Sequence, residues 1–409
     1  MTIEITPVSL SNAVSEFLAG KAKPMLIGDA WVAAQSAQTI PSCDPATGEL
    51  LATIPAGDKA DVDRAVAAAR AALKDGRWSG LTPSERSRVL WRIADLIEEH
   101  IDELAELETL DQGKPLYVGR WAEIPGAVEQ FRYFSGQATK IEGSTIPSSI
   151  NYQPEGKRIF AYTSKQPVGV VGAIVPWNSP LVLTAMNLAP ALAAGCSVVL
   201  KPAENTSLTA LRLGELMLEA GLPAGVLNIV TGYGHQAGAA LAGHPDVDKI
   251  SFTGSTATGR AIIDAAKGNL KKVSLELGGK SPVVICEDAD LDAAIAGAAN
   301  AIFFNAGQVC VAGSRLYAHR NIFDKVVDGI AQVAAGIRLG HGLDQHTQMG
   351  PLVSKVQAER VAGYMERASG AGARVVTGGD RPDSDGCFIT PTVITDVSSD
   401  MEIVREEVF

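Results

Sequence analysis

The chain has 409 residues, which is too long for one small domain, and its 46% hydrophobic and 20% charged residues are ordinary for a globular protein. Its net charge of −11 offers no attraction for nucleic acid or for an anionic membrane surface, so we expect neither as a partner. The first residues do not have the basic and apolar regions of a signal peptide, and no apolar stretch is long enough to predict a membrane span.

The five cysteines and six histidines argue against a metal site or a disulfide framework. The cysteines are widely spaced without a C-x-x-C pair, and the histidines do not have the spacing of metal ligands. We therefore expect no metal and a reducing, cytoplasmic setting, in which each cysteine is a core residue or a reactive thiol.

The first part of the chain predicts a hairpin followed by helices. Residues 26–56 alternate apolar runs with turn signals, and Asp44–Gly48 has the composition of the turn. A helical period begins at Lys59. Thr82–Glu85 has the pattern of a capping box with proline at the first helical position, which predicts a second helix.

Residues 145–167 predict a hairpin that stands off the main body. Polar sequence marked by glycine and proline precedes a strand-like segment at 158–163. An ordinary surface hairpin and an arm that pairs with another subunit fit this pattern about equally, since exposed strand edges are usually covered. We interpret the segment as an oligomerisation arm.

From Val168 to Leu277, short apolar strands alternate with helices, which predicts a parallel sheet covered on both faces. The predicted strands are 168–175, 197–200, 226–230, 249–252 and 273–277, and the predicted helices are 180–194, 207–219, 235–242 and 257–266. The alternation resumes after Ser281, with strands 283–286 and 316–319 around a helix at 291–304. Two α/β units are therefore expected to meet near residues 277–280.

Polar residues follow three of the predicted parallel strands, and ligands of such sheets bind at the carboxyl ends of the strands. Trp177-Asn178 follows the first strand, Lys201 and Glu204 follow the second, and Gly254-Ser255 follows the fourth and opens a helix. Taken singly, a solvated lysine, a helix-capping glutamate and a plain strand-to-helix turn explain these residues as well as ligand binding does.

Two further residues could have catalytic roles. Glu276 lies between apolar strand residues and two glycines, where burial would suit it to general-base work, although a strand-end glutamate in water fits equally well. Cys310 lies among glycine and polar residues at 307–314, which favours a nucleophilic thiolate over an inert core thiol. Cys196 precedes an apolar strand and is expected in the core.

Together these motifs resemble the aldehyde dehydrogenase superfamily. The resemblance runs from about residue 27 to the last residue, and seven stretches match in order: Glu108–Pro115, Pro176–Asn178, Lys201–Glu204, Phe252–Ser255, Glu276–Pro282, Gly307–Cys310 and Glu406–Phe409. It implies an α/β fold in which residues 1–144 and 168–279 form a dinucleotide-binding domain with a Rossmann-type parallel sheet. Residues 145–167 would form the protruding arm, and residues 280–409 a second α/β catalytic domain, incomplete at its C-terminus.

The resemblance implies oxidation of a small-molecule aldehyde to the carboxylic acid with NAD(P). By it, the Cys310 thiolate attacks the carbonyl, the Asn178 amide and the Cys310 backbone N–H hold the oxyanion, and Glu276 activates the water that hydrolyses the thioester. The presence of Glu276 argues against the acylating type, which passes the acyl group to coenzyme A. A catalytically silent cofactor-binding homologue or a truncated, non-functional fragment is the alternative.

For the cofactor, the resemblance places Lys201 and Glu204 on the adenosine ribose, Ser255 at the pyrophosphate and Glu407 at the nicotinamide ribose. A carboxylate at position 204 would repel a 2′-phosphate, so NAD is expected rather than NADP. The resemblance also assigns the remaining residues of the cofactor crevice, which are Val175, Trp177, Gly254 and Gly278.

Three features depart from the family pattern. Asn187 stands where many relatives carry lysine, which predicts weaker cofactor holding or a different proton route. Ser179 replaces a bulky aromatic residue, and Val309 and Val311 flank the thiol, which predicts an apolar aldehyde channel of altered shape. The sequence stops at Phe409 inside a family motif, and for the full-length chain we expect a homodimer or homotetramer.

Overall fold

The computed structural model describes residue 3, residues 8–148 and residues 155–409. A seven-stranded sheet forms its centre, in the order β11-β10-β7-β8-β9-β1-β2. The strands are β1 (Met25–Ile27), β2 (Ala30–Val32), β7 (Val170–Ile174), β8 (Ser197–Lys201), β9 (Leu227–Ile229), β10 (Lys249–Gly254) and β11 (Lys272–Leu277). Neighbours among β7 to β11 run parallel, whereas β1 and β2 join the β9 edge antiparallel. The predicted α/β class with a mainly parallel sheet is confirmed.

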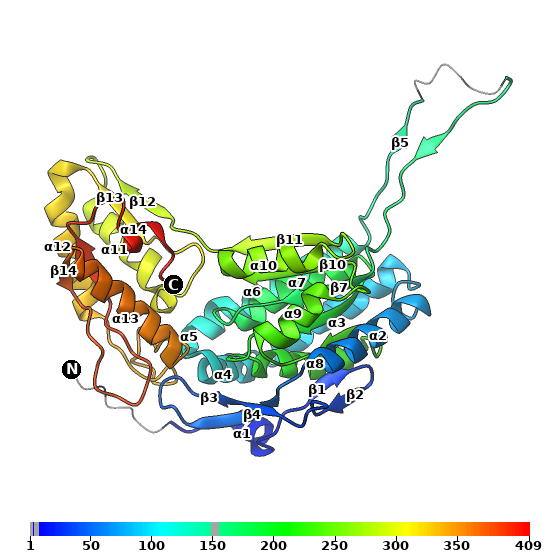
Figure 1. The fold of residues 1–409 in the computed structure, drawn as a ribbon, viewed down its shortest axis with the longest axis horizontal. Coiled ribbons are helices and arrows are strands. Elements are labelled where there is room, and N and C mark those ends of the chain that lie inside the picture. The colour runs from blue at the N-terminus through cyan, green and yellow to red at the C-terminus, as the bar shows by residue number, and fades with distance from the viewer. Residues whose placement is uncertain (1–2, 4–7, 149–154) are drawn as a thin grey trace.

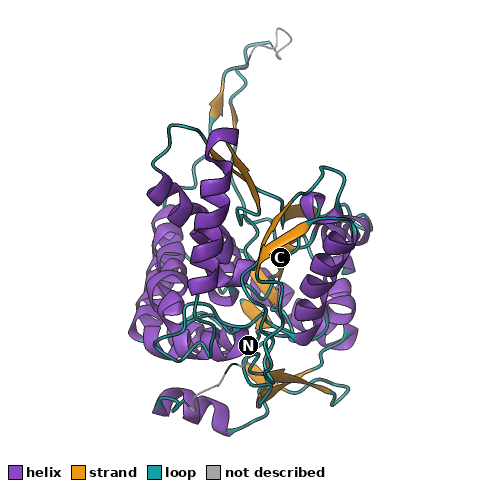
Figure 2. Ribbon diagram, turned by 90° about the vertical axis from the view of Figure 1, so that its left-hand side faces the viewer, coloured by secondary structure: helices purple, strands orange, loops and turns teal. Residues whose placement is uncertain are grey.

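Helices cover both faces of this sheet (Figure 2). Alternate residues of β7 point to opposite faces, so Val171 and Ala173 pack in one core cluster while Val170 and Ile174 pack in another. The first cluster contains α3 (Pro83–Glu99), α4 (Ile101–Gln112), α6 (Ile124–Ala138), α7 (Pro180–Ala193) and α8 (Leu208–Glu219). The second contains α2 (Lys59–Lys74), α9 (Ala239–Gly243) and α10 (Thr256–Ala266).

The order in which successive strands are added to the sheet reverses at β7. It runs from β7 to β8 and β9 on one side, and then returns to place β10 and β11 on the other side. Such a switch point opens a crevice at the carboxyl ends of the strands, where ligands of this architecture bind. The loops that carry the predicted site residues after β7, β8 and β10 all leave the sheet at this edge.

The predicted hairpin and capping box are confirmed. β3 (Thr39–Cys43) and β4 (Leu50–Pro55) pair antiparallel around the Asp44–Gly48 turn. Thr82 and Glu85 exchange both capping-box hydrogen bonds at the start of α3. The remaining helices of this half are α1 (Asn12–Ala19) and α5 (Leu116–Val118), and a π-helical turn at Gly119–Glu123 joins α5 to α6.

The predicted helix at 235–242 divides into two parts, a π-helical turn at Gly234–Gly238 and the short α9. The predicted hairpin at 145–167 projects from the body (Figure 1), but the strand predicted over 158–163 is shorter than expected. β5 (Thr145–Ile146) pairs antiparallel with β6 (Ala161–Tyr162), and residues 149–154 of this segment lie outside the described residues.

The strand–helix–strand unit predicted after Ser281 is confirmed. β12 (Pro282–Ile285) and β13 (Arg315–Ala318) are parallel and packed by α11 (Leu291–Phe303). The other α-helices and strands described in this part are α12 (Phe323–Gly336), α13 (Lys355–Gly370), β14 (Arg374–Thr377), β15 (Val393–Thr395) and α14 (Glu402–Arg405), and short 3₁₀ turns lie at Phe304–Gly307 and Arg320–Ile322. The proposed domain boundary at residues 279 and 280 stays a prediction. Among the described helices, none combines the length and apolar character needed to cross a membrane.

Candidate active site

Cys310 lies exposed in the loop between α11 and β13, as predicted, while Cys196 is buried. The chain enters this loop through three residues with left-handed φ, Asn305 at 50°, Ala306 at 56° and Gly307 at 81°. Asparagine and glycine tolerate this region, whereas Ala306 is strained there. Surrounding contacts must therefore hold the loop in place.

A buried amide network supplies those contacts. Gln308, two residues before the thiol, is fully buried; its Nε2 donates to the Asn305 carbonyl at 3.1 Å. Its Oε1 accepts from the Val353 backbone N–H at 3.0 Å, which ties the loop to the segment before α13. Both polar ends of the Gln308 side chain thus have hydrogen-bond partners, and these bonds hold the loop in place.

Asn178 joins the loop after β7 to the same network. Its side chain is buried, and Nδ2 donates to the Gln308 carbonyl at 3.1 Å. In return, Asn305 Nδ2 donates to the Asn178 carbonyl at 3.1 Å. An amide nitrogen carries two hydrogens, so one holds the two loops together and the other remains for an oxygen beside Cys310. The structure therefore brings Asn178 to the loop that carries the predicted nucleophile.

Glu276 has the environment of a strand-end glutamate in water, one of the two environments that its sequence left open. It lies in β11 opposite Thr253, and its side chain is exposed rather than buried. Glu276 is exposed because β11 is an edge strand of the sheet and its residues are covered only in part. No hydrogen bond between described residues links Glu276 to Cys310 or Asn178. A base role for it stays a prediction.

Lys201 and Glu204 are paired at the end of β8. Lys201 is 3% exposed, and its Nζ lies 2.8 Å from Glu204 Oε2. Burial alone would raise the pKa of Glu204, but the Lys201 ammonium holds that pKa below its ordinary value. The pair therefore presents an ionised carboxylate at the crevice. Val175 is buried beside it and donates its N–H to the Lys201 carbonyl at 3.1 Å.

The turn after β10 is a capped strand-to-helix turn. Ser255 is the N-cap of α10, and its Oγ accepts from the Thr258 N–H at 3.2 Å. Gly254 ends the strand directly before it. The turn is exposed, and the first N–H groups of a helix have no intrahelical partner, which is compatible with a bound anion.

The last residues of the chain lie against the predicted nicotinamide side of the crevice. A Cβ placed on Gly278 would collide with the Glu407 carboxylate, and the rings of Phe409 and Trp177 pack edge to face with centroids 5.1 Å apart. Burial raises the pKa of Glu407, and none of the described residues donates to its buried Oε1. Burial and the nearby Arg315 lower the pKa of Lys280 to about 8, partly opposed by Glu407.

The residues that depart from the family pattern have defined partners. Asn187 Nδ2 donates to the Leu183 carbonyl one turn earlier, at 2.8 Å, so this donor is used within α7. Ser179 Oγ donates to Glu123 Oε1 at 3.0 Å. Val311 is exposed, whereas Val309 lines a neighbouring cavity, so the two valines that flank the thiol face different surroundings.

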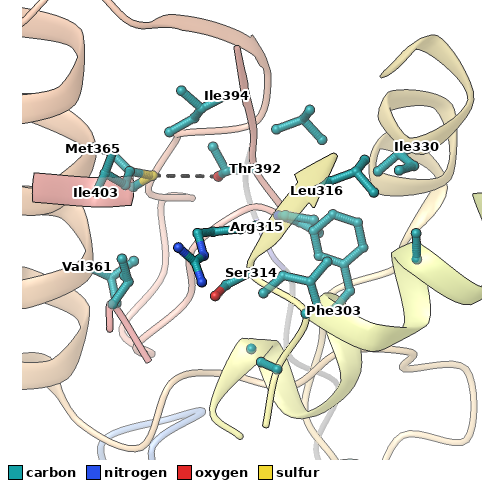
Figure 3. A pocket seen from close by; sticks show the side chains of 18 of the residues that line it. Phe303, Ser314, Arg315, Leu316, Ile330, Val361, Met365, Thr392, Ile394 and Ile403 are labelled. Carbon is teal, nitrogen blue, oxygen red and sulfur yellow. Dashed lines mark hydrogen bonds between the residues drawn. The ribbon is translucent and has the colours of Figure 1, made fainter. Parts of the chain in front are cut away.

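That cavity has a volume of about 500 Å³ and is mainly apolar (Figure 3). Side chains from α11, β13, α13 and β15 surround it, including Phe303, Leu316, Met365 and Ile394. Glu407 and Lys280 also line it, but Cys310, Asn178 and Glu276 do not. None of the three predicted catalytic side chains therefore lines this cavity.

Sequence reasoning missed the roles of Asn305 and Gln308. The Asn-Ala-Gly sequence before Gln308 was the available signal, because asparagine and glycine are the residues that accept left-handed backbone. No comparable local signal indicates that Gln308 is buried. Among the described residues, no cluster of three or more His, Cys, Asp or Glu side chains could hold a metal ion.

Comparison with known proteins shows the family of the chain. The family model described as "Aldehyde dehydrogenase family" matches residues 31–409. The chain is 48% identical over 402 residues to putative aldehyde dehydrogenase DhaS of Bacillus subtilis, covering 98% of this chain and 80% of that protein. It is 49% identical over 387 residues to phenylacetaldehyde dehydrogenase of Pseudomonas fluorescens, covering 94% and 77%. The NAD⁺ complex of aldehyde dehydrogenase from Bacillus cereus superposes with a TM-score of 0.95 at 47% identity, covering 99% and 81%. The chain belongs to the aldehyde dehydrogenase family.

Proposed function

We propose that this protein oxidises an aldehyde to the carboxylic acid, with NAD as the hydride acceptor and Cys310 as the nucleophile. The hydrogen bond from Asn178 Nδ2 to the Gln308 carbonyl carries the proposal, because it holds an amide donor against the loop of an exposed thiol. A soft nucleophile next to a preorganised donor suits attack on a carbonyl.

In the first step, the Cys310 thiolate donates an electron pair to the carbonyl carbon, and the C=O π electrons move to oxygen. The free N–H of the Asn178 amide and the Cys310 backbone N–H hold the resulting oxyanion, and one such donor typically contributes ~3–4 kcal/mol. When the oxyanion reforms a carbonyl, hydride leaves the carbon and a thioester remains on Cys310.

In the second step, Glu276 removes a proton from water, whose oxygen attacks the thioester and releases the acid and the thiolate. The exposed position of Glu276 gives its carboxylate access to solvent water. A separate base is needed because the thiolate is the leaving group of this step.

The residues at the crevice fit a dinucleotide. Glu407 has a buried oxygen that no described residue satisfies, and its carboxylate packs so closely against Gly278 that only a residue without a Cβ fits there. Lys201 and Glu204 would hold the adenosine ribose, and the first turn of α10 behind Ser255 would face the pyrophosphate. NAD supplies the hydride acceptor at this site. The ionised Glu204 carboxylate supports NAD over NADP, because it would lie near a 2′-phosphate of like charge.

Replacement of Cys310 tests the proposal. Cys310→Ala should abolish aldehyde-dependent NADH production, whereas Cys286→Ala should retain it, since Cys286 is the other exposed cysteine of the chain. Undiminished NADH production by Cys310→Ala would rule out the assignment. A wild-type protein that binds NAD but oxidises none of a panel of aliphatic, aromatic and amino-aldehydes would instead favour a silent homologue.

The exposed arm supports assembly with a second copy of the chain. Phe160 is 74% exposed and Tyr162 67%, and their rings lie 5.8 Å apart on a hairpin that projects from the body (Figure 1). Exposed aromatic side chains beside a strand edge are suited to pairing. A Phe160→Ser/Tyr162→Ser variant should lower the mass measured by light scattering, and an unchanged mass would contradict this role.

A further inference from the structure

The stretch Glu108–Pro115, which no step above uses, ends α4 with two buried carboxylates. Glu108 and Asp111 are 0% and 1% exposed and stand three residues apart, so they lie on the same side of the helix. Each reaches the first turn of a different helix. Glu108 Oε2 accepts from the Leu181 N–H of α7 at 3.1 Å, and Asp111 Oδ2 accepts from the Leu208 N–H of α8 at 2.9 Å.

Neither helix is capped by its own N-cap side chain. Ser179 precedes α7, but its hydroxyl donates to Glu123 Oε1 at 3.0 Å. Ser207 precedes α8, but its hydroxyl donates to the Ala203 carbonyl at 2.8 Å. First-turn N–H groups need an acceptor when they are buried, and a carboxyl oxygen from another helix supplies one. The carboxylates of α4 take the place of the missing caps.

The two helices follow the two loops on which the proposed function depends. α7 begins two residues after Asn178, the oxyanion donor, and α8 begins four residues after Glu204, the ribose residue. We propose that Glu108 and Asp111 are positioning residues: Glu108 fixes the loop that carries Asn178, and Asp111 fixes the loop that carries Lys201 and Glu204. This inference rests on the proposed function, since it names what holds its groups in place.

Glu108 is itself held by a buried cation. Lys114 is fully buried, and its Nζ lies 2.8 Å from Glu108 Oε1 and 3.2 Å from Glu123 Oε1. Glu123 in turn accepts from Ser179, so both acids paired with Lys114 contact the segment between Asn178 and Leu181. The clamp formed by Glu108, Lys114 and Glu123 therefore has little freedom to shift.

The two carboxylates differ in their response to an amide substitution. Glu108 accepts from two donors that cannot reverse, the Lys114 ammonium and the Leu181 N–H. In Glu108→Gln, the amide oxygen should stay with the Lys114 ammonium, so the NH₂ group would face the Leu181 N–H. Both of these groups are donors, so the hydrogen bond that caps α7 would be lost. Asp111 accepts from the Leu208 N–H and from the Ser42 hydroxyl at 2.7 Å, and a hydroxyl can also accept. Asp111→Asn should therefore keep its cap, whereas Asp111→Leu should lose it.

The experiment measures three quantities on purified variants: turnover per titrated thiol, NAD affinity by calorimetry, and deuterium exchange of peptides spanning residues 178–183 and 205–210. Glu108→Gln should lower turnover about tenfold or more with NAD affinity within about twofold, and should speed exchange only in 178–183. Asp111→Leu should weaken NAD binding about fivefold or more and speed exchange only in 205–210. Asp111→Asn should match the wild type in all three.

Asp58→Ala is the matched control. Asp58 is the carboxylate N-cap of α2 and accepts from the Ala60 N–H at 2.8 Å, but α2 follows none of the predicted ligand loops. It should leave turnover and NAD affinity unchanged. A loss of NAD affinity as large as the loss of turnover in Glu108→Gln would overturn the positioning role of Glu108. Unchanged exchange of 178–183 in Glu108→Gln and of 205–210 in Asp111→Leu would overturn both positioning roles. Absence of turnover in the wild type would instead contradict the proposed function, and the exchange and NAD data would still test the caps.

Discussion

Asp111 should make the stability of this protein fall as pH rises. Burial raises the pKa of Asp111 from its ordinary 3.8 to about 7, with the nearby Glu108 carboxylate adding to the rise and hydrogen bonds from Ser42 and Leu208 opposing it. Between these two values the folded protein keeps a proton that the unfolded chain has released. The contribution of this group to the free energy of unfolding therefore falls as pH rises from about 4 to about 7.

The size of the effect follows from the two pKa values. They differ by about 3, and each whole step of pKa corresponds to about 1.4 kcal/mol, so the full effect of this carboxyl group is about 4 kcal/mol. Part of this stabilisation is already lost at pH 5. Between pH 5 and pH 8, the free energy of unfolding should therefore fall by about 2–3 kcal/mol through this group alone.

Asp111→Asn removes the titration while keeping both hydrogen bonds. Urea unfolding of the wild type and of Asp111→Asn at pH 5 and pH 8 measures the difference, and the variant should gain about 2–3 kcal/mol relative to the wild type between these two pH values. Asp292→Asn, at an exposed position in the first turn of α11, should follow the wild type. Parallel pH profiles for Asp111→Asn and the wild type would refute the reasoning.

Three further substitutions test the crevice. Asn178→Ala should lower kcat by about 10²- to 10³-fold in steady-state assays, because it removes one oxyanion donor. Glu204→Gln should raise kcat/KM with NADP relative to NAD by roughly tenfold, or about 1.4 kcal/mol, because it removes a charge facing the 2′-phosphate. Gly278→Ala should weaken NAD binding measured by calorimetry, because the added Cβ would displace the Glu407 carboxylate.

Gly297→Ala is a control for the glycine substitution, because a Cβ at this position in α11 meets no atom within 4 Å. It should bind NAD as the wild type does. An unchanged kcat in Asn178→Ala, an unchanged cofactor ratio in Glu204→Gln, or full NAD affinity in Gly278→Ala would each contradict the corresponding assignment.

The alternation of strands and helices from Val168 onward was predictable because buried parallel strands are short and continuously apolar. The positions of Trp177, Asn178 and Ser255 at strand ends followed from the same pattern. The exposure of Glu276 did not, because local hydrophobicity does not distinguish an edge strand from a central one, and β11 is an edge strand.

The residues that hold the site in place could not be predicted from the local sequence pattern either. Glu108 bonds Leu181 across 73 residues, and Asp111 bonds Leu208 across 97. A carboxylate on an amphipathic helix normally faces water, and only tertiary packing turns these two inward. Gln308 is similar, since polar residues near a thiol suggest an open loop, whereas this side chain is fully buried.

Trapping the acyl group tests the central claim most directly. A Glu276→Gln variant incubated with NAD and aldehyde should form about one NADH per subunit and then stop, with the acyl mass found by mass spectrometry on the peptide that contains Cys310. The same adduct should be absent in Glu276→Gln/Cys310→Ala. An acyl group on Cys286, or continuous NADH production without any adduct, would contradict the account.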